Sequence, residues 1–331
     1  MEYAYLGRSN VKVSKVCLGT MHFGRRCDEK ESFAIMDRAL EMGINFWDTA
    51  NVYGDPSGRS EEIIGRWFAQ GGNRRDQVVL ATKVYGGMNK PGPNEERGIS
   101  DYKIRMHVAE SLRRLQTDRI DLYQVHHIDR HITPEEFWGA FERLQLKGDI
   151  LYVGTSNFPG WGLAKYQAAA WQRGSVGIVS EQSMYSLLCR YPELEVLPAA
   201  KEFGIGVIPY MPLAGGLLTG KTQSVEGSRT AQVEGEYGMR VSDGQIFRDF
   251  SALCKELGET ESVVAIAWTL HQTAVTSAIV GIRSVAHLEG LDRAAALHLD
   301  EAALKRLDEI FDINKGRPLR VSSPAPEAYA W

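Results

Sequence analysis

The sequence predicts an α/β fold of the (β/α)8 TIM-barrel type, built as a single domain over residues 1–331. Short apolar segments alternate with amphipathic segments of helical periodicity, eight times along 331 residues. The apolar segments lack the polar alternation of half-exposed strands, as expected for parallel strands that are covered on both faces. The competing fold, a doubly wound open sheet, would need a GxGxxG fingerprint after a strand, and the sequence has none.

An opening hairpin is expected before the predicted strands. They cover residues 16–20, 44–49, 78–83, 120–126, 150–157, 177–182, 205–210 and 276–281.

The predicted helices lie between these strands and have recognisable ends. Ser60 is expected to cap the helix that follows the second strand, with Glu61 and Glu62 in its first turn. The pair Thr133-Pro134 is a strong helix start, and Gly148 ends that helix. The full set covers residues 28–42, a segment from 60, 103–116, 134–148, a segment from 161, a segment ending at 204, 244–257, 261–272 and a segment from 285.

Two long polar segments, residues 86–100 and 222–238, interrupt the alternation. Each follows a strand, so a barrel places both as extended loops at its C-terminal mouth. Long loops at this position are usually functional lids, and the alternative is a disordered insertion. The tail, about residues 315–331, either covers the mouth or is a mobile end.

Composition excludes several functional classes. The chain is 24% charged with a net charge of −4, which points to neither a nucleic-acid nor an anionic-membrane partner. No apolar run approaches the roughly 18–20 residues that span a bilayer, and the N-terminus does not resemble a secretory signal. The four cysteines are scattered and are expected to be free thiols. We therefore expect a cytoplasmic protein that acts on a small molecule, as a monomer or a homo-oligomer.

Polar side chains stand at nearly every predicted strand end. In a barrel these ends converge on one face, where active sites lie. The residues are Gly19-Thr20-Met21, Asp48, Lys83, His126, Ser156-Asn157, Gln182, Tyr210 and Gly281-Ile282-Arg283.

Asp48, Tyr53, Lys83 and His126 together predict a proton-transfer site. Alone, Asp48 is commonly a turn former and Tyr53 a packing residue. A free phenol has a pKa of about 10, and a neighbouring lysine cation favours the phenolate and lowers that pKa. Asp48 would hold Lys83 charged, and His126 would hydrogen-bond the same substrate oxygen as Tyr53. Such a site is suited to protonating a carbonyl oxygen as it becomes an alkoxide.

A metal site is the alternative for the histidine-rich segment that contains His126, His127, Asp129 and His131. Adjacent histidines on a strand point to opposite faces, so at most one would face the barrel interior. No clear third and fourth ligand accompanies them, and we expect no metal.

Seven motifs occur in a specific order: FWDTANVYG, ATK, DLYQVHH, VGTSN, EQ, IPYMPLAGGLLTGK and IVGIRS. The set closely resembles the aldo-keto reductases from about residue 4 to 310. It is most similar to the long-chain bacterial branch related to the potassium-channel β subunits. The resemblance implies an NADPH-dependent oxidoreductase that reduces an aldehyde or ketone, with Tyr53 as general acid. It also leaves open an NADP(H)-binding, redox-sensing subunit with little turnover.

The resemblance also implies a cofactor site. Ser156, Asn157 and Gln182 would hold the nicotinamide carboxamide, and Tyr210 would stack on its ring. Residues 211–221 would wrap the pyrophosphate. Arg283 would meet the 2′-phosphate of NADP, which a guanidinium can pair bidentately. The expected cofactor residues are Gly19, Thr20, Met21, Asp48, Ser156, Asn157, Gln182, Tyr210, Met211, Pro212, Leu213, Ala214, Gly216, Lys221, Arg229, Gly281, Arg283, Ser284 and His287.

The sequence departs from the family pattern near the adenine. Gly290 and Leu291 stand where a Glu-Asn pair is frequent, and His287 replaces a common Gln. The phosphate contact is therefore better supported than the adenine contacts.

Substrate contacts are expected from Tyr53 and His126, with Trp47, Tyr85 and His127 as walls of the site. The substrate itself stays open between simple aldehydes, sugars, nucleotide-linked keto sugars and polyketide-like ketones.

The segment GGLLTGKT, residues 215–222, matches the P-loop pattern GxxxxGK[ST]. That motif requires a strand directly before it and a helix directly after it. Here Pro212 intervenes, and the following QSVEGSRT lacks helical periodicity. We expect this segment to approach a dinucleotide pyrophosphate and not to bind ATP.

Overall fold

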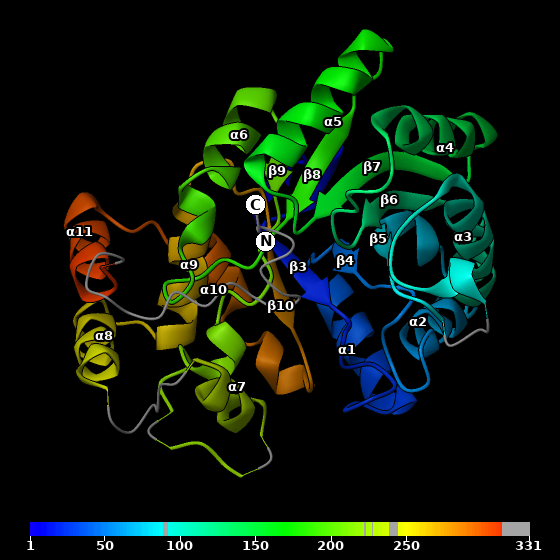
Figure 1. Cartoon of the computed structure of the whole chain (residues 1–331). Coiled ribbons are helices and arrows are strands. Elements are labelled where there is room, and N and C mark those ends of the chain that lie inside the picture. Colours follow the sequence, from blue (N-terminus) through cyan, green and yellow to red (C-terminus); the bar gives the residue numbers. More distant parts are fainter. Residues whose placement is uncertain (89–91, 222, 227, 238–243, 313–331) are drawn as a thin grey trace.

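The computed structural model describes residues 1–88, 92–221, 223–226, 228–237 and 244–312. Figure 1 shows parallel strands at the centre of the molecule and helices around them. The predicted tail at 315–331 lies outside the described residues, as do parts of both long loops.

The parallel sheet forms the predicted barrel. In the described part of the chain its eight strands run in the order β10-β3-β4-β5-β6-β7-β8-β9. Bridges from Val207 to Val275 and from Tyr210 to Ile279 join the segments of β9 and β10, so the ladder continues around the ring. The strands are β3 (Val16–Gly19), β4 (Phe46–Asp48), β5 (Val79–Val84), β6 (Ile120–Val125), β7 (Ile150–Ser156), β8 (Ile178–Gln182), β9 (Gly206–Val207) and β10 (Ala278–Gly281). The (β/α)8 prediction is confirmed.

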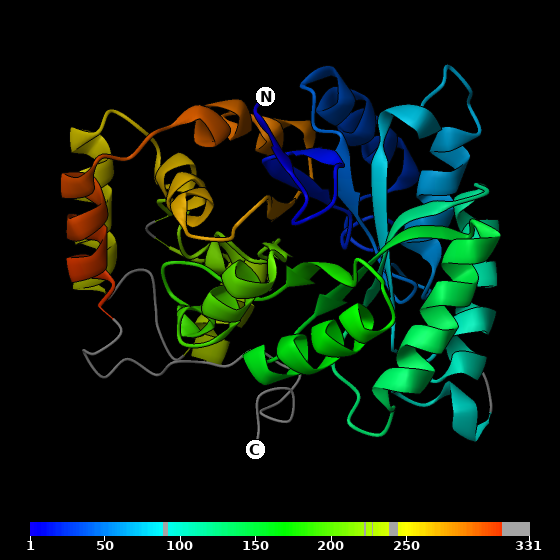
Figure 2. The ribbon, with the colours of Figure 1, turned by 90° about the horizontal axis from the view of Figure 1, so that it is seen from above.

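Helices cover the outside of the strands (Figures 1 and 2). They are α1 (Glu29–Glu41), α2 (Arg59–Phe68), α3 (Asp101–Leu115), α4 (Pro134–Lys147), α5 (Gly160–Gln172), α6 (Val196–Phe203), α7 (Arg229–Tyr237), α8 (Gln245–Glu256), α9 (Glu261–His271), α10 (Leu291–Ala296) and α11 (Glu301–Ile310).

Local sequence explains several helix ends. The Asp28 side chain accepts a hydrogen bond from the Glu31 N–H at 2.8 Å, and Thr133 caps α4 in the same way. Gly148 and Gly204 end α4 and α6 in the left-handed conformation.

The Ser60 cap prediction is wrong. The N-cap of α2 is Gly58, and Ser60 lies inside the helix. Its hydroxyl is buried and hydrogen-bonds the Thr20 and Thr49 hydroxyls, each at 3.0 Å. Ser60 therefore ties the start of α2 to the loops after β3 and β4.

Two other element predictions need correction. The segment 222–238 contains a helix, α7, where a polar loop was expected. The helix expected from residue 285 is a 3₁₀ turn, Val285–Leu288, followed by the separate helix α10. Gly290, at φ 79°, separates the two because a left-handed residue ends helical geometry.

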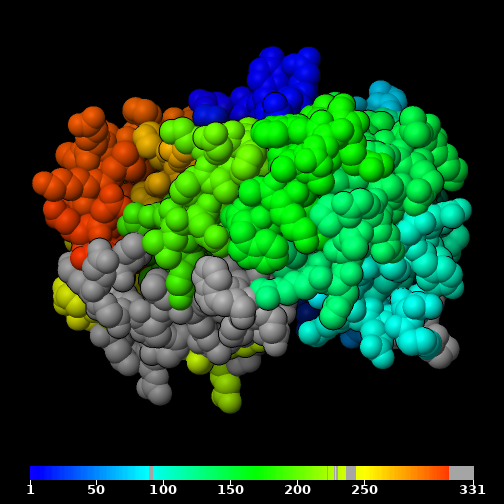
Figure 3. Space-filling view, turned by 45° about the horizontal axis from the view of Figure 1, so that its top comes forward, coloured from blue at the N-terminus to red at the C-terminus, as the bar shows by residue number. Residues whose placement is uncertain are grey.

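The N-terminal hairpin, β1 (Tyr3–Tyr5) and β2 (Lys12–Ser14), closes one end of the barrel. Leu6 and Val13 join the cluster that fills the barrel interior. A side chain at Gly7 would come within 2.2 Å of the Val179 carbonyl, near the start of β8, so the hairpin turn lies directly against the strand starts. Figure 3 shows the hairpin projecting from this end, which leaves the opposite end for the strand-end side chains.

The described helices include none that is long and apolar enough to cross a membrane. The four cysteines, Cys17, Cys27, Cys189 and Cys254, are free and buried.

Candidate active site

An ion pair between Asp48 and Lys83 forms the centre of the site. Asp48 ends β4, and Lys83 lies on the neighbouring strand β5. The Lys83 Nζ donates to Asp48 Oδ1 at 2.5 Å, to the Thr49 carbonyl at 2.9 Å and to the Tyr53 hydroxyl at 3.2 Å. Because Lys83 is fully buried, its charge needs these partners.

Strand pleating explains why Asp48 reaches this centre and Trp47 does not. Successive side chains on a strand point to opposite faces. Trp47 is fully buried on the helix-facing side, where its ring packs 4.9 Å from Trp67. The prediction that Trp47 forms a wall of the substrate site is therefore wrong.

Burial and neighbouring charges together set the pKa values of Lys83 and Tyr53. Burial would lower the pKa of Lys83, but Asp48 and Tyr53 outweigh it and raise that pKa above its ordinary value, as expected. Burial also raises the pKa of Tyr53, and Lys83 lowers it without cancelling the rise. The lowering by Lys83 is therefore present as expected, and burial, which is the larger cause, outweighs it.

The imidazole of His126 lies beside the phenol. The two ring centroids are 5.8 Å apart, and the Tyr53 and His126 rings meet edge to face at 78°. Burial, Lys83 and His127 lower the pKa of His126 well below its ordinary value. His126 is therefore a neutral imidazole near pH 7 and can donate only one N–H.

His127 lies on the same side as His126, contrary to the expected alternation. Their rings stack at 5.0 Å and 3°. The alternation does not apply because β6 ends at Val125, before both histidines. Tyr85 packs edge to face on His127 at 5.1 Å, so of the two predicted walls His127 contacts His126 directly and Tyr85 contacts His127.

A buried amide, Gln124, was missed in the sequence. Its Nε2 donates to Asp48 Oδ2 at 3.0 Å, and its Oε1 accepts from Gln182 Nε2 at 3.3 Å. Gln182 also donates to Asp48 Oδ2 at 2.8 Å. Gln124 lies on the buried strand β6, two residues before His126. A polar residue among the apolar residues of a buried strand is a sequence signal for a side chain with a polar partner.

Ser156, Asn157 and Tyr210 form a second hydrogen-bonded group at the same mouth. The Asn157 amide donates to Ser156 Oγ at 3.1 Å and accepts from the Tyr210 hydroxyl at 2.9 Å. The Ser156 hydroxyl donates to the Gln182 carbonyl at 2.8 Å. Together with Gln182, these hydroxyl and amide groups match the donors and acceptors of a carboxamide.

The backbone around this group adopts left-handed conformations at residues other than glycine. Asn157 has φ 56°, Met211 has φ 58° and Ala214 has φ 47°. Such residues are uncommon and cluster at ligand sites. The turn after Tyr210 also contains Gly215 and Gly216 at positive φ, which gives residues 211–216 a tightly folded backbone.

Cationic side chains lie at the edge of the mouth. The Arg283 N–H donates to His287 Nδ1 at 3.3 Å. Burial, Arg283 and Lys221 lower the pKa of His287. Ser284 Oγ lies 3.4 Å from His287 Nδ1. No described carboxylate pairs with Lys221 or Arg283, so this group fits a phosphate.

The remaining predicted cofactor residues vary in exposure. Gly19 and Gly281 pair in register at adjacent strand ends. Thr20 is fully buried and donates to the Asp48 carbonyl at 2.9 Å, whereas Met21 is exposed. The side chain of Arg229 lies outside the described residues. Buried residues in the expected set include Pro212 and Ala214, whereas Leu213 is half-buried.

The described part of the loop 86–100 is anchored beside Tyr53. The Lys103 Nζ donates to the Tyr85 carbonyl at 2.7 Å. His107 joins the loop to the Tyr53 segment, because its Nδ1 lies 2.8 Å from Asn51 Nδ2 and its Nε2 lies 3.3 Å from Glu95 Oε2.

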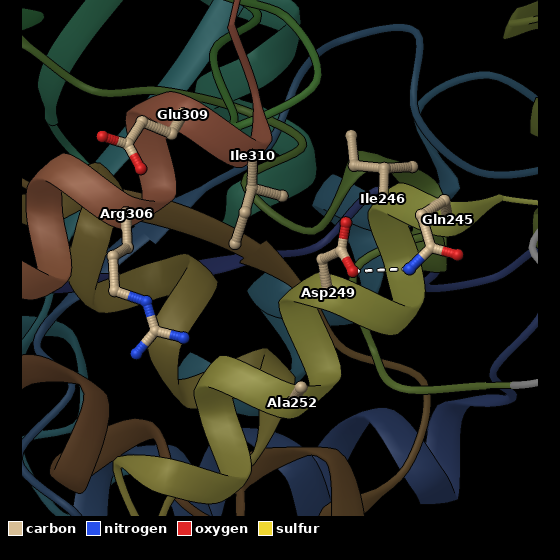
Figure 4. Close-up of a pocket in the computed structure, with 7 residues that line it drawn as sticks. All are labelled: Gln245, Ile246, Asp249, Ala252, Arg306, Glu309 and Ile310. Carbon is tan, nitrogen blue, oxygen red and sulfur yellow. Dashed lines mark hydrogen bonds between the residues drawn. The ribbon is translucent and has the colours of Figure 1, made fainter.

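Three further observations concern a second pocket, metal ligands and the P-loop-like segment. A pocket between α8 and α11, at the edge of the molecule, contains no strand-end side chain (Figure 4). Within the described ranges, no group of three or more His, Cys, Asp and Glu side chains could hold a metal ion. After the P-loop-like segment, the next described helix, α7, begins at Arg229, so that segment lacks the strand–loop–helix context of a P-loop.

The depressed histidine pKa values predict a stability change in acid. Burial, Arg97 and Lys83 lower the pKa of His127 from its ordinary value to about 4. Between pH 6.5 and 4 the unfolded chain binds the proton more readily, so the free energy of unfolding falls as pH falls. Over this range the wild type should lose about 2 kcal/mol more than a His127→Gln variant, measured by urea denaturation. Parallel pH profiles for the two proteins would contradict this.

Comparison with known proteins agrees with this geometry. A family model described as "Aldo/keto reductase family" matches residues 15–312. The chain is 51% identical over 336 residues to "Uncharacterized oxidoreductase YrpG" of Bacillus subtilis, across 100% of both chains. It is 31% identical to "Aldo-keto reductase dtxS3" of Metarhizium robertsii, over 94% of this chain and 91% of that one. It is 30% identical to "Norsolorinic acid reductase B" of Dothistroma septosporum, over 96% of this chain and 83% of that one.

The family predicted from the ordered motifs is thereby confirmed. The chain belongs to the aldo/keto reductase family and is a carbonyl-reducing oxidoreductase.

Proposed function

We propose that this protein reduces an aldehyde or ketone to an alcohol with NADPH, and that Tyr53 is the general acid. The observation that carries the proposal is the position of the Lys83 Nζ, 2.5 Å from Asp48 Oδ1 and 3.2 Å from the Tyr53 hydroxyl. A cation held by a carboxylate and directed at a phenol is an arrangement that supports proton donation.

NADPH, when bound, supplies the hydride. The chain's own residues act on the carbonyl oxygen. The burial that raises the Tyr53 pKa keeps the phenol protonated until a substrate is present. As negative charge develops on the substrate oxygen, the Tyr53 hydroxyl donates its proton, and the Lys83 ammonium stabilises the phenolate that remains. Neutral His126 donates an N–H to the same oxygen and orients the carbonyl.

The cofactor assignment is supported by two groups at the mouth. Ser156, Asn157 and Gln182 are suited to a carboxamide, and Tyr210 offers a half-buried ring beside them. Lys221 and Arg283, without a described carboxylate partner, are suited to phosphate groups.

Arg283→Ala should weaken NADPH binding far more than NADH binding. A guanidinium paired with a phosphate dianion contributes charge-assisted hydrogen bonds that NADH, without a 2′-phosphate, does not use. We expect about a 10- to 100-fold rise in Kd for NADPH and less than about threefold for NADH, by fluorescence titration. Arg293→Ala, at an exposed arginine on α10, is the matched control. Equal losses for the two cofactors in Arg283→Ala would remove the 2′-phosphate assignment.

The function itself is tested with the wild type. NADPH should bind in a fluorescence titration, and its absorbance should fall when a panel of aldehydes and ketones is supplied. The panel should include norsolorinic acid, because relatives carry that name. Hydrolysis of ATP without NADPH binding would refute the proposal. NADPH binding without turnover of any carbonyl would favour the redox-sensing alternative.

A further inference from the structure

Glu181 is a fully buried carboxyl directly behind the proposed carboxamide group. It lies on β8 next to Gln182 and is 0% exposed. Strand pleating directs its side chain away from the face that carries Gln182. Neither the proton-transfer site nor the proposed cofactor contacts use Glu181 directly.

The carboxyl accepts hydrogen bonds from three different segments. Thr155 Oγ1 donates to Oε2 at 2.5 Å, Ser183 Oγ donates to Oε1 at 2.8 Å, and the Phe158 N–H donates to Oε1 at 3.2 Å. Thr155 lies at the end of β7, Phe158 lies in the turn that follows it, and Ser183 lies just after β8. Glu181 therefore holds the turn at residues 156–158 against the two strands.

This turn needs such support. Asn157 adopts φ 56°, a left-handed conformation that costs free energy in residues other than glycine. Its N–H donates to the Gln182 carbonyl at 3.0 Å, while Glu181 binds the next N–H, that of Phe158. Two consecutive backbone N–H groups are thus fixed by two consecutive residues of β8.

We propose that Glu181 is a positioning residue for the cofactor, which fixes the 156–158 turn so that Ser156 and Asn157 present their side chains to the nicotinamide carboxamide. The inference rests on the proposed function, because it assumes that NADPH binds at this mouth.

The chemistry of Glu181 is consistent with a geometric role. Burial raises its pKa to about 7, and the hydrogen bonds from Thr155, Ser183 and Phe158 limit the rise. A buried carboxyl is costly to retain, but its two oxygens can accept from several donors at once. An amide of the same length could preserve this geometry. Its oxygen would accept from Phe158, and its NH₂ would donate to Thr155 Oγ1, which can turn toward the Ser180 carbonyl at 3.4 Å.

Two substitutions separate geometry from charge. Glu181→Asp keeps the carboxyl group but shortens the reach to the Phe158 N–H. Glu181→Gln keeps the reach and removes the charge. We expect Glu181→Asp to raise the Kd for NADPH by about 10- to 100-fold, because an unsatisfied buried N–H releases the turn, and Glu181→Gln to stay within about threefold of wild type. In both variants kcat at saturating NADPH should stay within about threefold of wild type, because Asp48, Lys83 and Tyr53 are unchanged.

Glu61→Asp is the matched control. Glu61 is also a fully buried glutamate with a hydroxyl donor, Thr82 at 2.6 Å, and it pairs with Arg114 at 2.7 Å on the helix-facing side. Shortening it should lower the melting temperature without changing the Kd for NADPH.

Each outcome distinguishes the two proposals. Wild-type protein that fails to bind NADPH would refute the proposed function. If the wild type binds and Glu181→Asp binds equally well, the positioning role alone is overturned. A larger loss of affinity in Glu181→Gln than in Glu181→Asp would overturn it too, because charge and not reach would then govern binding. If Glu181→Asp fails to fold, the Glu181→Gln result still decides, since the positioning role requires near-normal affinity there.

Discussion

Tyr53→Phe is expected to lower kcat for carbonyl reduction by about 10²- to 10⁴-fold. The substitution removes the hydroxyl that Lys83 contacts at 3.2 Å and leaves the ring in place against His126. The loss concerns a proton delivered in the transition state, so the Kd for NADPH should stay within about twofold of wild type. Stopped-flow absorbance of NADPH with a saturating aldehyde measures the first quantity, and fluorescence titration measures the second.

Tyr123→Phe is the matched control, because it removes the same hydroxyl group at a position outside the proposed active site. Tyr123 lies on β6, is fully buried, and its hydroxyl has no hydrogen-bond partner among the described residues. Removing that hydroxyl should leave turnover unchanged. Wild-type turnover in Tyr53→Phe would remove Tyr53 from its assigned role.

Asp48→Asn is expected to lower the free energy of unfolding by about 3–5 kcal/mol. The change leaves the Lys83 ammonium fully buried without its counter-charge. It also places an amide where Asp48 Oδ2 accepts from both Gln124 and Gln182, so one donor there can lose its acceptor. Urea denaturation at pH 7 gives the change, and carbonyl reduction should fall as well because Lys83 loses its orientation.

The double variant Asp48→Asn/Lys83→Met tests the cause. It removes both charges together, and replacing a buried pair costs much less than breaking it. We expect the double variant to be more stable than Asp48→Asn by at least about 1 kcal/mol. The single variant Lys83→Met completes the comparison. If the loss of stability in the double variant equals the sum of the losses in Asp48→Asn and Lys83→Met, the ion pair is not the source of the cost.

The eightfold alternation of apolar and amphipathic segments was sufficient to predict the barrel, and the polar residues at and after its strand ends indicated the four central side chains. Asp48, Lys83 and His126 follow from strand ends that converge in any such barrel, and Tyr53 follows from the loop after Asp48. Trp47 is next to Asp48 in the sequence but does not reach the site, because strand pleating directs the two side chains to opposite faces.

Other features depend on packing that spacing does not encode. The Tyr53 pKa depends on how much solvent the folded loops exclude, which no residue pattern gives. Ser60 could cap α2 or bond to Thr20, and only the approach of the β3 loop decides between them. Gln124 and Glu181 lie in apolar strands and have their partners on other strands, so their hydrogen bonds appear only once the barrel is assembled.

The buried cysteines have a practical consequence for handling the protein. Burial raises the pKa of Cys17 well above its ordinary value, that of Cys27 to about 11, and those of Cys189 and Cys254 to about 12. Because the thiolate is the form that reacts with oxidants and alkylating agents, these four side chains resist both near neutral pH. The enzyme should therefore keep its activity in air without added dithiothreitol and after treatment with iodoacetamide.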